Sequence, residues 1–480
     1  MVKDKAQLRA PLWEAVTQFA GDTMGNFHVP GHKGGRFFDR EASSFFSSLL
    51  PLDLTEVGNL DDLHQAEGAI AEAQQLAAAC FGADRSFFLV GGSTAGNLAL
   101  ILATCQPGDR LIVQRESHQS VWNGCILAGV QPIYVSGGID ERGLPRSLDP
   151  EVLREAFSRY PEAKAAFITS PDYDGHIQPV RQLAQVCHAC NRPLLVDEAH
   201  GAHLGFHPDL PASALNEGAD AAVQSTHKLL AAMTQASMLH LKGLRVDNER
   251  VASWLRMLQS SSPSYPLMAS LDVARRLMAT EGEEQLERLL QRLLRLRLEV
   301  NRLQSIREMP AVMERDPLKL SLMAEVRGEA VSGIRLARFL EKQNLWPELA
   351  DHRRVLAVFT PGNQEAEFTR FIHALRHLDD VVTTFPRESQ QIHLQTPLLA
   401  DSAQPLDKIH RQAAVPVPLD EAVGLVAKVA VVPYPPGIPL ILPGETISEQ
   451  HVSAIRDQYQ NEAKIRGLAS RSPLSIFVLQ

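Results

Sequence analysis

The sequence predicts an α/β protein built on a mostly parallel β-sheet, with a smaller α+β domain and a C-terminal domain. Three features of the chain carry this prediction. From about residue 70, segments of helical and of strand-like composition alternate. A long amphipathic segment follows at 281–303, and an irregular Pro- and Gln-rich stretch follows at 386–418. These breaks predict an N-terminal arm and large domain at 1–280, a linker helix and small domain at 281–385, and a linker and C-terminal domain at 386–480.

The elements of the large domain can be placed in order along the chain. Helical composition marks 69–83, 97–109, 119–129, 150–160 and 179–191, and apolar strands are expected at 86–90, 110–114, 131–136, 165–170, 193–200 and 221–225. A helix between successive strands is typical of a parallel sheet covered on both faces. Residues 237–243 follow the last of these strands so closely that we expect them to return antiparallel.

The segment 281–303 is expected to leave the large domain as one long helix. One face carries leucines at helical spacing, namely Leu286, Leu289, Leu290, Leu293 and Leu294. The segment is too short for the three or four heptads of a coiled coil. Beyond it, strand, helix, strand and helix are expected at 318–326, 333–344, 355–360 and 365–378. Five prolines between 433 and 443 exclude a regular helix or a central strand there.

Composition narrows the class of protein. The chain has 480 residues, is 45% hydrophobic and 21% charged, and carries a net charge of −9, so no electrostatic argument favours nucleic acid or an anionic membrane as a partner. The N-terminus lacks the apolar region of a signal peptide, and no apolar run of about 18 residues occurs. Five cysteines, an odd and sparse set, favour a reducing compartment, so we expect a cytoplasmic protein without disulfides.

Two of these cysteines, Cys187 and Cys190, form a C-x-x-C pattern. A redox or zinc site is one interpretation, but no second C-x-x-C exists to complete a zinc site. The surrounding stretch also has the composition of a helix that ends before a buried strand. We therefore expect the two thiols to serve packing.

The turn "VGGSTAGNLAL" joins a predicted strand to a predicted helix. Gly91 and Gly92 permit a sharp turn, after which Ser93, Thr94 and the first helical N–H groups face outward. Such a helix N-terminus favours an anion, most often phosphate. The turn is neither G-x-G-x-x-G nor a Walker sequence, and serine and threonine are also ordinary N-cap residues, so this signal is weak alone.

Support for a phosphate-containing cofactor comes from two strand ends. Asp197 ends the apolar strand of "PLLVDEAHGAH", and Lys228 lies 31 residues later, after the next strand. In parallel sheets the carboxyl ends of strands face the ligand crevice. Pyridoxal phosphate needs a lysine for its aldehyde, an aspartate for its ring nitrogen and hydroxyl groups for its phosphate, and this set of residues matches those needs.

The same residues allow other interpretations. "DEAH" alone could be a helicase box, but that box requires an upstream phosphate loop with GK[ST], which the chain lacks. His200 and His203 have a spacing that zinc ligands can adopt, but a third ligand is undefined, so no metal is expected. His118 follows a strand end on the same edge, where an imidazole can stack on a flat cofactor.

Several segments carry a resemblance to a known family. "STHKLLAAMTQAS" resembles the cofactor-lysine signature of the Orn/Lys/Arg decarboxylases, which are fold-type-I pyridoxal phosphate enzymes. Further similar segments occur in the family's order and span nearly the whole chain, namely "NFHVPGHKGG", "DLTEVGNLDDLHQAEGAI", "GGSTAGN", "DEAHGAH", "SPSYPLMASLD" and "YPPGIPLILPGE". The first and last of these are specific to this family within the fold type.

The resemblance implies roles for individual residues. Lys228 would form the Schiff base, Asp197 would pair with the pyridinium, and His118 would stack on the ring. The remaining implied cofactor or catalytic residues are Ser93, Thr94, His200, Ser225 and His227. Ser262 would reach the cofactor of a neighbouring subunit, so a homodimer or higher homo-oligomer is expected. The chain resembles the short form of the family, which has no N-terminal wing domain.

The implied reaction is decarboxylation of arginine, lysine or ornithine to agmatine, cadaverine or putrescine, with arginine slightly favoured. Two departures from the family pattern, Glu116 and the segment 171–175, leave substrate choice open. Acidic candidates for the substrate's cationic side chain are Glu56, Asp61, Asp62, Asp172 and Asp174. Alternatives are an aminotransferase, with Arg353 or Arg354 as a carboxylate clamp, another pyridoxal phosphate enzyme such as an aldolase, and a non-catalytic regulatory relative.

Overall fold

The computed structural model describes residues 4–22, 25–139, 146–311, 313–386, 397–434, 439–460 and 464–480. The chain forms two compact units. The first comprises Met1–Thr104 and Pro193–Gln285, and the second comprises Cys105–Arg192 and Leu286–Gln480. The three domains expected from the sequence remain a prediction.

In the first unit, four strands lie in the order β1 (Arg85–Leu89), β7 (Ser237–Leu241), β6 (Ala221–Gln224) and β5 (Leu194–Asp197). β5 and β6 are parallel, with Asp197 opposite Val223. β7 runs antiparallel to both β6 and β1, so the reversed strand expected at 237–243 is confirmed. Their residues are almost all buried, which explains why these strands appear as continuous apolar runs rather than alternating ones.

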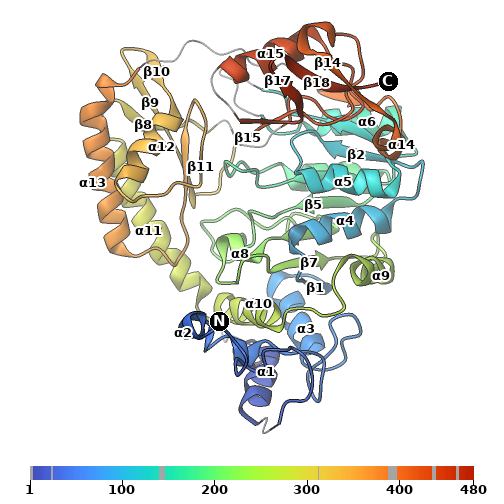
Figure 1. Cartoon of the computed structure of the whole chain (residues 1–480), viewed down its shortest axis with the longest axis vertical. Helices are drawn as coiled ribbons and strands as arrows, with labels where there is room; N and C mark the ends of the chain where they lie inside the picture. The colour runs from blue at the N-terminus through green and yellow to red at the C-terminus, as the bar shows by residue number, and fades with distance from the viewer. Residues whose placement is uncertain are drawn as a thin grey trace. The chain divides into compact units, whose positions relative to one another are not determined.

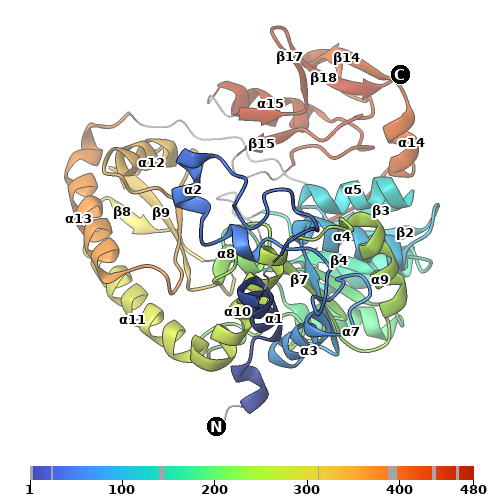
Figure 2. The same ribbon diagram turned by 60° about the horizontal axis from the view of Figure 1, so that its bottom comes forward.

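Helices pack on this sheet in the first unit. α4 (Gly92–Thr104) contacts all four strands, and α9 (Asn248–Leu258) packs on α4 (Figure 1). α1 (Pro11–Asp22) lies against α3 (Ala69–Phe81) and α10 (Tyr265–Leu277) (Figure 2). The N-terminal arm also contains α2 (Arg40–Phe46), which has no buried residue.

In the second unit, β4 (Ala166–Thr169), β2 (Arg110–Gln114) and β3 (Gln131–Val135) form a parallel set in that order. The intervening helices are α5 (Gln119–Ala128) and α6 (Pro150–Arg159), and α7 (Val180–Ala189) follows β4. The βα alternation expected from the sequence is therefore confirmed.

Irregular structure was expected throughout 386–418, but this is wrong for the described part, because β13 (Leu399–Asp401) pairs with β3, and α14 (Leu406–Arg411) and β14 (Ala414–Pro418) follow.

The long helix is α11 (Glu283–Val300), and a π-helical turn at Met278–Gly282 precedes it. Leu286, Leu289 and Leu293 are buried as expected, and the apolar stripe continues through Leu296 and Val300. Leu294 was assigned to this face, but it is exposed, so that assignment is wrong. The stripe follows the 3.6-residue period, and Leu294 lies one residue past it.

The smaller strand–helix unit expected after α11 is confirmed as an antiparallel sheet with two helices. Its strands lie in the order β10 (Glu329–Val331), β9 (Lys319–Val326), β12 (Val355–Val358) and β11 (Leu349–Ala350), and β8 (Ile306–Glu308) also pairs with β9. α12 (Gly333–Lys342) and α13 (Glu365–Val381) complete it.

The C-terminal part contains β17 (Leu468–Arg471), β18 (Leu474–Leu479) and β14 in one sheet, β15 (Val432–Tyr434) paired with β16 (Lys464–Arg466), and α15 (Glu449–Gln460). The apolar composition of the proline-rich segment favours an exposed patch on a monomer, but its described part, 439–445, is wholly or partly buried within this chain. Ile441 joins a local core, and Glu445 forms a buried ion pair with Arg115.

Across the described ranges, every helix is too short or too polar to cross a membrane.

Candidate active site

Lys228 lies just past the carboxyl end of β6. The strand ends at Gln224, and Ser225 is the N-cap of the one-turn helix α8 (Thr226–Leu229) that carries the lysine. The Lys228 side chain is half-buried, and its Nζ lies 3.1 Å from Nε2 of the buried His200. His200 follows β5, so the ends of two neighbouring parallel strands bring the amine and the imidazole together.

Hydroxyl groups gather at the start of α4. Gly92 has a φ of 71°, a conformation that favours glycine, and it allows the sharp turn from β1 into the helix. The Oγ atoms of Ser93 and Ser225 lie 2.6 Å apart, and Ser237 Oγ is 3.4 Å from Ser93 Oγ. Thr94 is exposed on the same first turn. The structure therefore brings Ser93 and Ser225 together at a helix N-terminus, where an anion is favoured.

His227 is held by the loop after its own helix. Its backbone N–H and its ring Nδ1 both bond the carbonyl of Ala236, at 3.2 and 3.0 Å. A carbonyl only accepts, so Nδ1 carries the hydrogen and Nε2 is the basic nitrogen. Burial lowers the pKa of His227, and the nearby Lys228 charge lowers it further. The ring is therefore mainly neutral near pH 7 and would need a proton before Nε2 could donate to a phosphate.

Asp197 is buried at the carboxyl end of β5. Its Oδ2 accepts a hydrogen bond from Nδ2 of Asn97 at 2.8 Å, and its Oδ1 accepts from the N–H of Ala199 at 3.1 Å. Two donors thus compensate the lost hydration of the carboxylate. The sequence did not point to Asn97, although it stands four residues after Ser93 and therefore on the same face of a helix.

A second buried network begins at the next residue, Glu198. Its carboxyl accepts from the N–H of Ala214 at 2.7 Å and from Nε2 of Gln224 at 2.8 Å. Gln224 Oε1 lies 3.2 Å from Nε2 of His240, whose Nδ1 is 2.7 Å from Ser86 Oγ. Burial raises the pKa of Glu198 to about 8 and lowers that of His240 to about 3. The network links β1, β7 and β6 to the end of β5.

Two further expected site residues, Ser262 and His118, stand on other elements, as does Glu116, one of the departures from the family pattern. Ser262 is exposed in the loop between α9 and α10. His118 belongs to the second unit, where it is exposed and caps α5 by accepting from the N–H of Ser120. Glu116, two residues earlier, accepts from Ser136 Oγ at 2.6 Å, and burial raises the pKa of its carboxyl.

The segment 171–176 in the second unit is tied to the smaller sheet by buried charges. Asp174 pairs with Arg354 at 2.6 Å and accepts from Ser321 Oγ at 3.2 Å. Asp351 also contacts the Arg354 guanidinium, at 3.3 Å. Lys319 Nζ donates to the carbonyls of residues 172 and 173. Arg354, one candidate for a carboxylate clamp, is thus already paired with two carboxylates.

The acidic candidates for a substrate cation are mostly engaged by the protein itself. Asp61 accepts hydrogen bonds from the N–H groups of Gly68, Ile70 and Ala71, so it caps the N-terminus of α3 although it lies several residues before the helix. Asp62 accepts from the N–H of residue 64, and Asp172 pairs with residue 176. Glu56 accepts from Thr55 through one oxygen, and its other oxygen is buried without a partner in the described structure.

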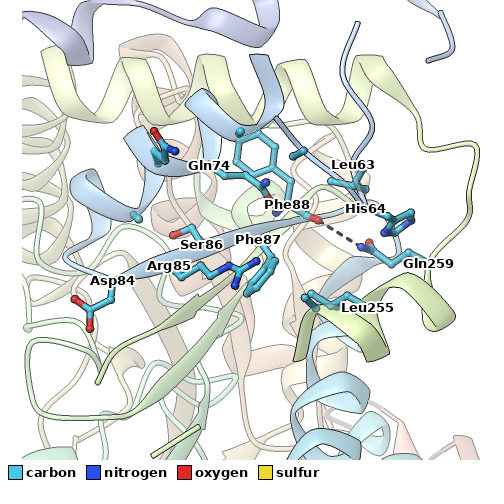
Figure 3. Close-up of a pocket in the computed structure, with 15 residues that line it drawn as sticks. Leu63, His64, Gln74, Asp84, Arg85, Ser86, Phe87, Phe88, Leu255 and Gln259 are labelled. Carbon is cyan, nitrogen blue, oxygen red and sulfur yellow. Dashed lines mark hydrogen bonds between the residues drawn. The ribbon is translucent and has the colours of Figure 1, made fainter. Parts of the chain in front are cut away.

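A cavity of about 220 Å³ lies along the outer edge of β1 and is lined mainly by residues of α3, β1 and α9, and Lys228 is not among its lining residues (Figure 3). Gln74 accepts from the N–H of Phe88, and Gln259 accepts from the N–H of Val90 and faces the carbonyl of Phe88 (Figure 3). These amides satisfy the edge strand's backbone groups. The polar side chains of this cavity therefore serve the edge of the sheet, and the cavity is not the candidate active site.

Comparison with known proteins finds matches over most of the chain. The model of the Orn/Lys/Arg decarboxylase major domain matches residues 10–315, and that of the C-terminal domain matches residues 387–460. The chain is 39% identical to the uncharacterized protein YaaO of Bacillus subtilis, over 96% of each chain, and 36% identical to an arginine decarboxylase of the same organism, over 94% of each. The crystal structure of the Francisella novicida lysine decarboxylase LdcF superimposes with a TM-score of 0.86 at 20% identity, covering 99% of this chain and 82% of that one.

The fold and these matches define an α/β enzyme of fold type I, and by class it is an amino acid decarboxylase, a carboxy-lyase. The chain belongs to the Orn/Lys/Arg decarboxylase family.

Proposed function

We propose that this protein uses pyridoxal phosphate, bound through Lys228, to remove the α-carboxylate of a basic amino acid, with arginine as the favoured substrate. The choice of arginine rests on the 36% identity to a protein named arginine decarboxylase, whereas two relatives named lysine decarboxylase are 23% and 26% identical. The products would be agmatine and CO₂.

The arrangement of three groups in the first unit carries the proposal. An amine at Lys228, a hydroxyl pair at Ser93 and Ser225, and a buried carboxylate at Asp197 stand at the carboxyl ends of adjacent parallel strands and at the helix N-terminus beside them. These groups fit the aldehyde, the phosphate and the ring nitrogen of pyridoxal phosphate respectively.

The cofactor, when bound, supplies an electron sink for the bond that breaks. The protein supplies position and charge. Ser93, Thr94 and Ser225 would hold the phosphate, and the Asp197 carboxylate would pair with the ring nitrogen. His118 is the proposed stacking partner of the ring, and Ser262 is proposed to act at a neighbouring subunit's site.

A proton must return to the substrate carbon after CO₂ leaves. Lys228 Nζ and His200 Nε2 lie 3.1 Å apart, within the range for direct proton transfer, so this pair is proposed to store and deliver that proton. His227 lies next to Lys228 in the chain, and its mainly neutral ring would help to keep positive charge low beside the amine.

The aminotransferase alternative is disfavoured by the state of Arg354. A carboxylate clamp needs a guanidinium with free donors, whereas Arg354 is buried between Asp174 and Asp351. Its charge is therefore already balanced inside the protein.

A homodimer is also proposed. The N-terminal arm exposes Phe27, Phe37 and Phe45 at 99%, 82% and 84% of their surface. Aromatic groups this exposed on one segment are typical of an interface. A second copy of the chain would cover them most simply, since two-fold interfaces are the commonest.

Product analysis tests the proposal. The purified protein, supplied with pyridoxal phosphate, is incubated separately with arginine, lysine and ornithine, and the amine and CO₂ are quantified. We expect agmatine and CO₂ in equal amounts from arginine. A keto acid, or no product from any of the three, would overturn the proposal.

A further inference from the structure

Helix α4 presents two polar side chains, one turn apart, to the strand ends of the first unit. Ser93 in its first turn contacts Ser225, and Asn97 in its second contacts Asp197. Both residues are buried, and their spacing of four places them on one face of the helix. A single rigid element therefore touches both the proposed phosphate site and the carboxylate proposed for the ring nitrogen.

Gly96 allows α4 to approach the sheet closely enough for these contacts. A Cβ atom at this position would lie 2.8 Å from Cγ1 of Val223 and 2.9 Å from Cδ1 of Leu89. Both distances are shorter than normal carbon–carbon contacts, so any other residue would force the helix or these two side chains to shift. Asn97, the next residue, depends on that close packing to reach Asp197.

The hydrogen bond from Asn97 fixes the orientation of the Asp197 carboxyl. An amide N–H only donates, and the Ala199 N–H is also a donor, so both oxygens of Asp197 accept. Donors around a buried carboxyl stabilise its ionised form and fix its rotamer. A protonated Asp197 would have to turn its O–H away from both donors.

We propose that Asn97 is a positioning residue that holds the Asp197 carboxylate in one orientation for the ring nitrogen of the cofactor. The inference rests on the proposed function, since it assumes that Asp197 serves that nitrogen. Asn97 itself would touch neither the substrate nor the reacting atoms.

The test compares Asn97→Ala and Asn97→Asp with a control on the same helix, Thr104→Val. Thr104 Oγ1 has no hydrogen-bond partner in the described structure, so the control removes a hydroxyl without removing a bond. Each protein is loaded with pyridoxal phosphate that carries ¹⁵N in the ring, and the nitrogen chemical shift is followed against pH. Circular dichroism and the cofactor dissociation constant show whether each variant folds and binds.

We expect the ring nitrogen of the wild type and of Thr104→Val to stay protonated up to a higher pH than that of Asn97→Ala. The titration midpoint should fall by about one pH unit in Asn97→Ala, roughly a tenfold change in the protonation equilibrium. The value of kcat should fall by about tenfold or more, with KM nearly unchanged. Asn97→Asp places two carboxyls together, so it should alter the same titration while binding the cofactor.

An unchanged nitrogen titration in a folded, cofactor-loaded Asn97→Ala would overturn the inference, even if its activity fell. A titration midpoint that shifts equally in Thr104→Val would also overturn it, because the effect would then be general to the helix. A wild-type protein that binds no pyridoxal phosphate would instead refute the proposed function. Should Asn97→Ala fail to fold, Asn97→Asp, which preserves the side-chain shape, decides the question by the same titration.

Discussion

Lys228 Nζ and His200 Nε2 lie 3.1 Å apart, although 28 residues separate them in the chain. The contact exists because β5 and β6 are parallel neighbours and each places one of the two groups just past its carboxyl end. An ammonium at Lys228 can donate only to a nitrogen without a hydrogen, so His200 would accept at Nε2. The pair can therefore hold one proton close to the point where the cofactor aldehyde would be bound.

Replacing His200 should separate cofactor attachment from turnover. His200→Gln keeps a polar group but removes the base, so we expect hydride reduction still to attach the cofactor to Lys228 while kcat falls by about a hundredfold or more. His373→Gln, at an exposed position of α13, is the control and should retain wild-type kcat. A His200→Gln enzyme with wild-type kcat would show that the imidazole takes no part in proton transfer.

Glu198 should make stability depend on pH in the neutral range. Its pKa is raised from 4.5 to about 8 by burial, so between these values the folded protein keeps a proton that the unfolded chain releases. The resulting stabilisation is complete below pH 4.5 and is lost as pH rises through 8. In cofactor-free protein, Glu198→Gln should flatten this decline in thermal midpoint between pH 5 and 8. The exposed Glu249→Gln should leave the decline unchanged; equal slopes in wild type and Glu198→Gln would contradict the assignment.

Removing one partner of the buried ion pair between Asp174 and Arg354 should lower the free energy of unfolding markedly. Arg354→Met leaves the Asp174 and Asp351 carboxylates without their cation, and we expect destabilisation of about 3–5 kcal/mol. Adding Asp174→Asn should recover part of this loss. The exposed pair of Arg154 and Glu151 provides a control, since Arg154→Met should cost at most about 1 kcal/mol. Thermal midpoints measured at one pH check the series, and an additive double variant would show that the residues do not interact.

The exposed aromatic side chains of the N-terminal arm should control association. Substituting Phe27, Phe37 and Phe45 by serine removes apolar surface that a second copy would cover, so sedimentation should show monomers at concentrations where the wild type is dimeric. Leu244→Ser, at a position that is 97% exposed elsewhere in the same unit, is the control. A wild-type protein that is fully active as a monomer would refute the proposed dimer.

Shared sites can be tested by mixing inactive variants. Lys228→Ala protein is combined with protein inactivated at Ser262, and subunit exchange is confirmed by mass-tagged chains. If Ser262 serves a neighbouring subunit's site, some mixed dimers contain one intact site and activity returns. If exchange occurs without recovery, each site is built from one chain.

Much of the fold was predictable because the strand and helix signals are local. Apolar runs that alternate with helical segments predict β1 to β7, and the short connection between residues 225 and 237 predicts the direction of β7. The helical stripe was also predictable, but Leu294 was misassigned, because five leucines within nine residues leave the exact face ambiguous. The burial of the proline-rich segment could not be predicted, because it depends on long-range packing, including the ion pair between Arg115 and Glu445.

The site was predictable in part for the same reason. Asp197, Lys228 and the serines stand at element ends, where sequence patterns are strongest. Asn97 and the Glu198–Gln224–His240 network could not be predicted from those patterns, because their hydrogen bonds join separate elements. The structural roles of Asp61 and Asp174 could not be predicted either. The sequence alone does not distinguish a carboxylate that caps a helix or pairs with a buried arginine from one that binds substrate.

The central claim is that Lys228 holds the cofactor, and peptide mapping after hydride reduction tests it most directly. The protein is incubated with pyridoxal phosphate, reduced with borohydride and digested, and the modified peptide is sequenced by mass spectrometry. We predict one pyridoxyl group per chain, on Lys228, and none in Lys228→Ala, which should also be inactive. A stoichiometric adduct on another lysine, with Lys228 unmodified, would contradict the account.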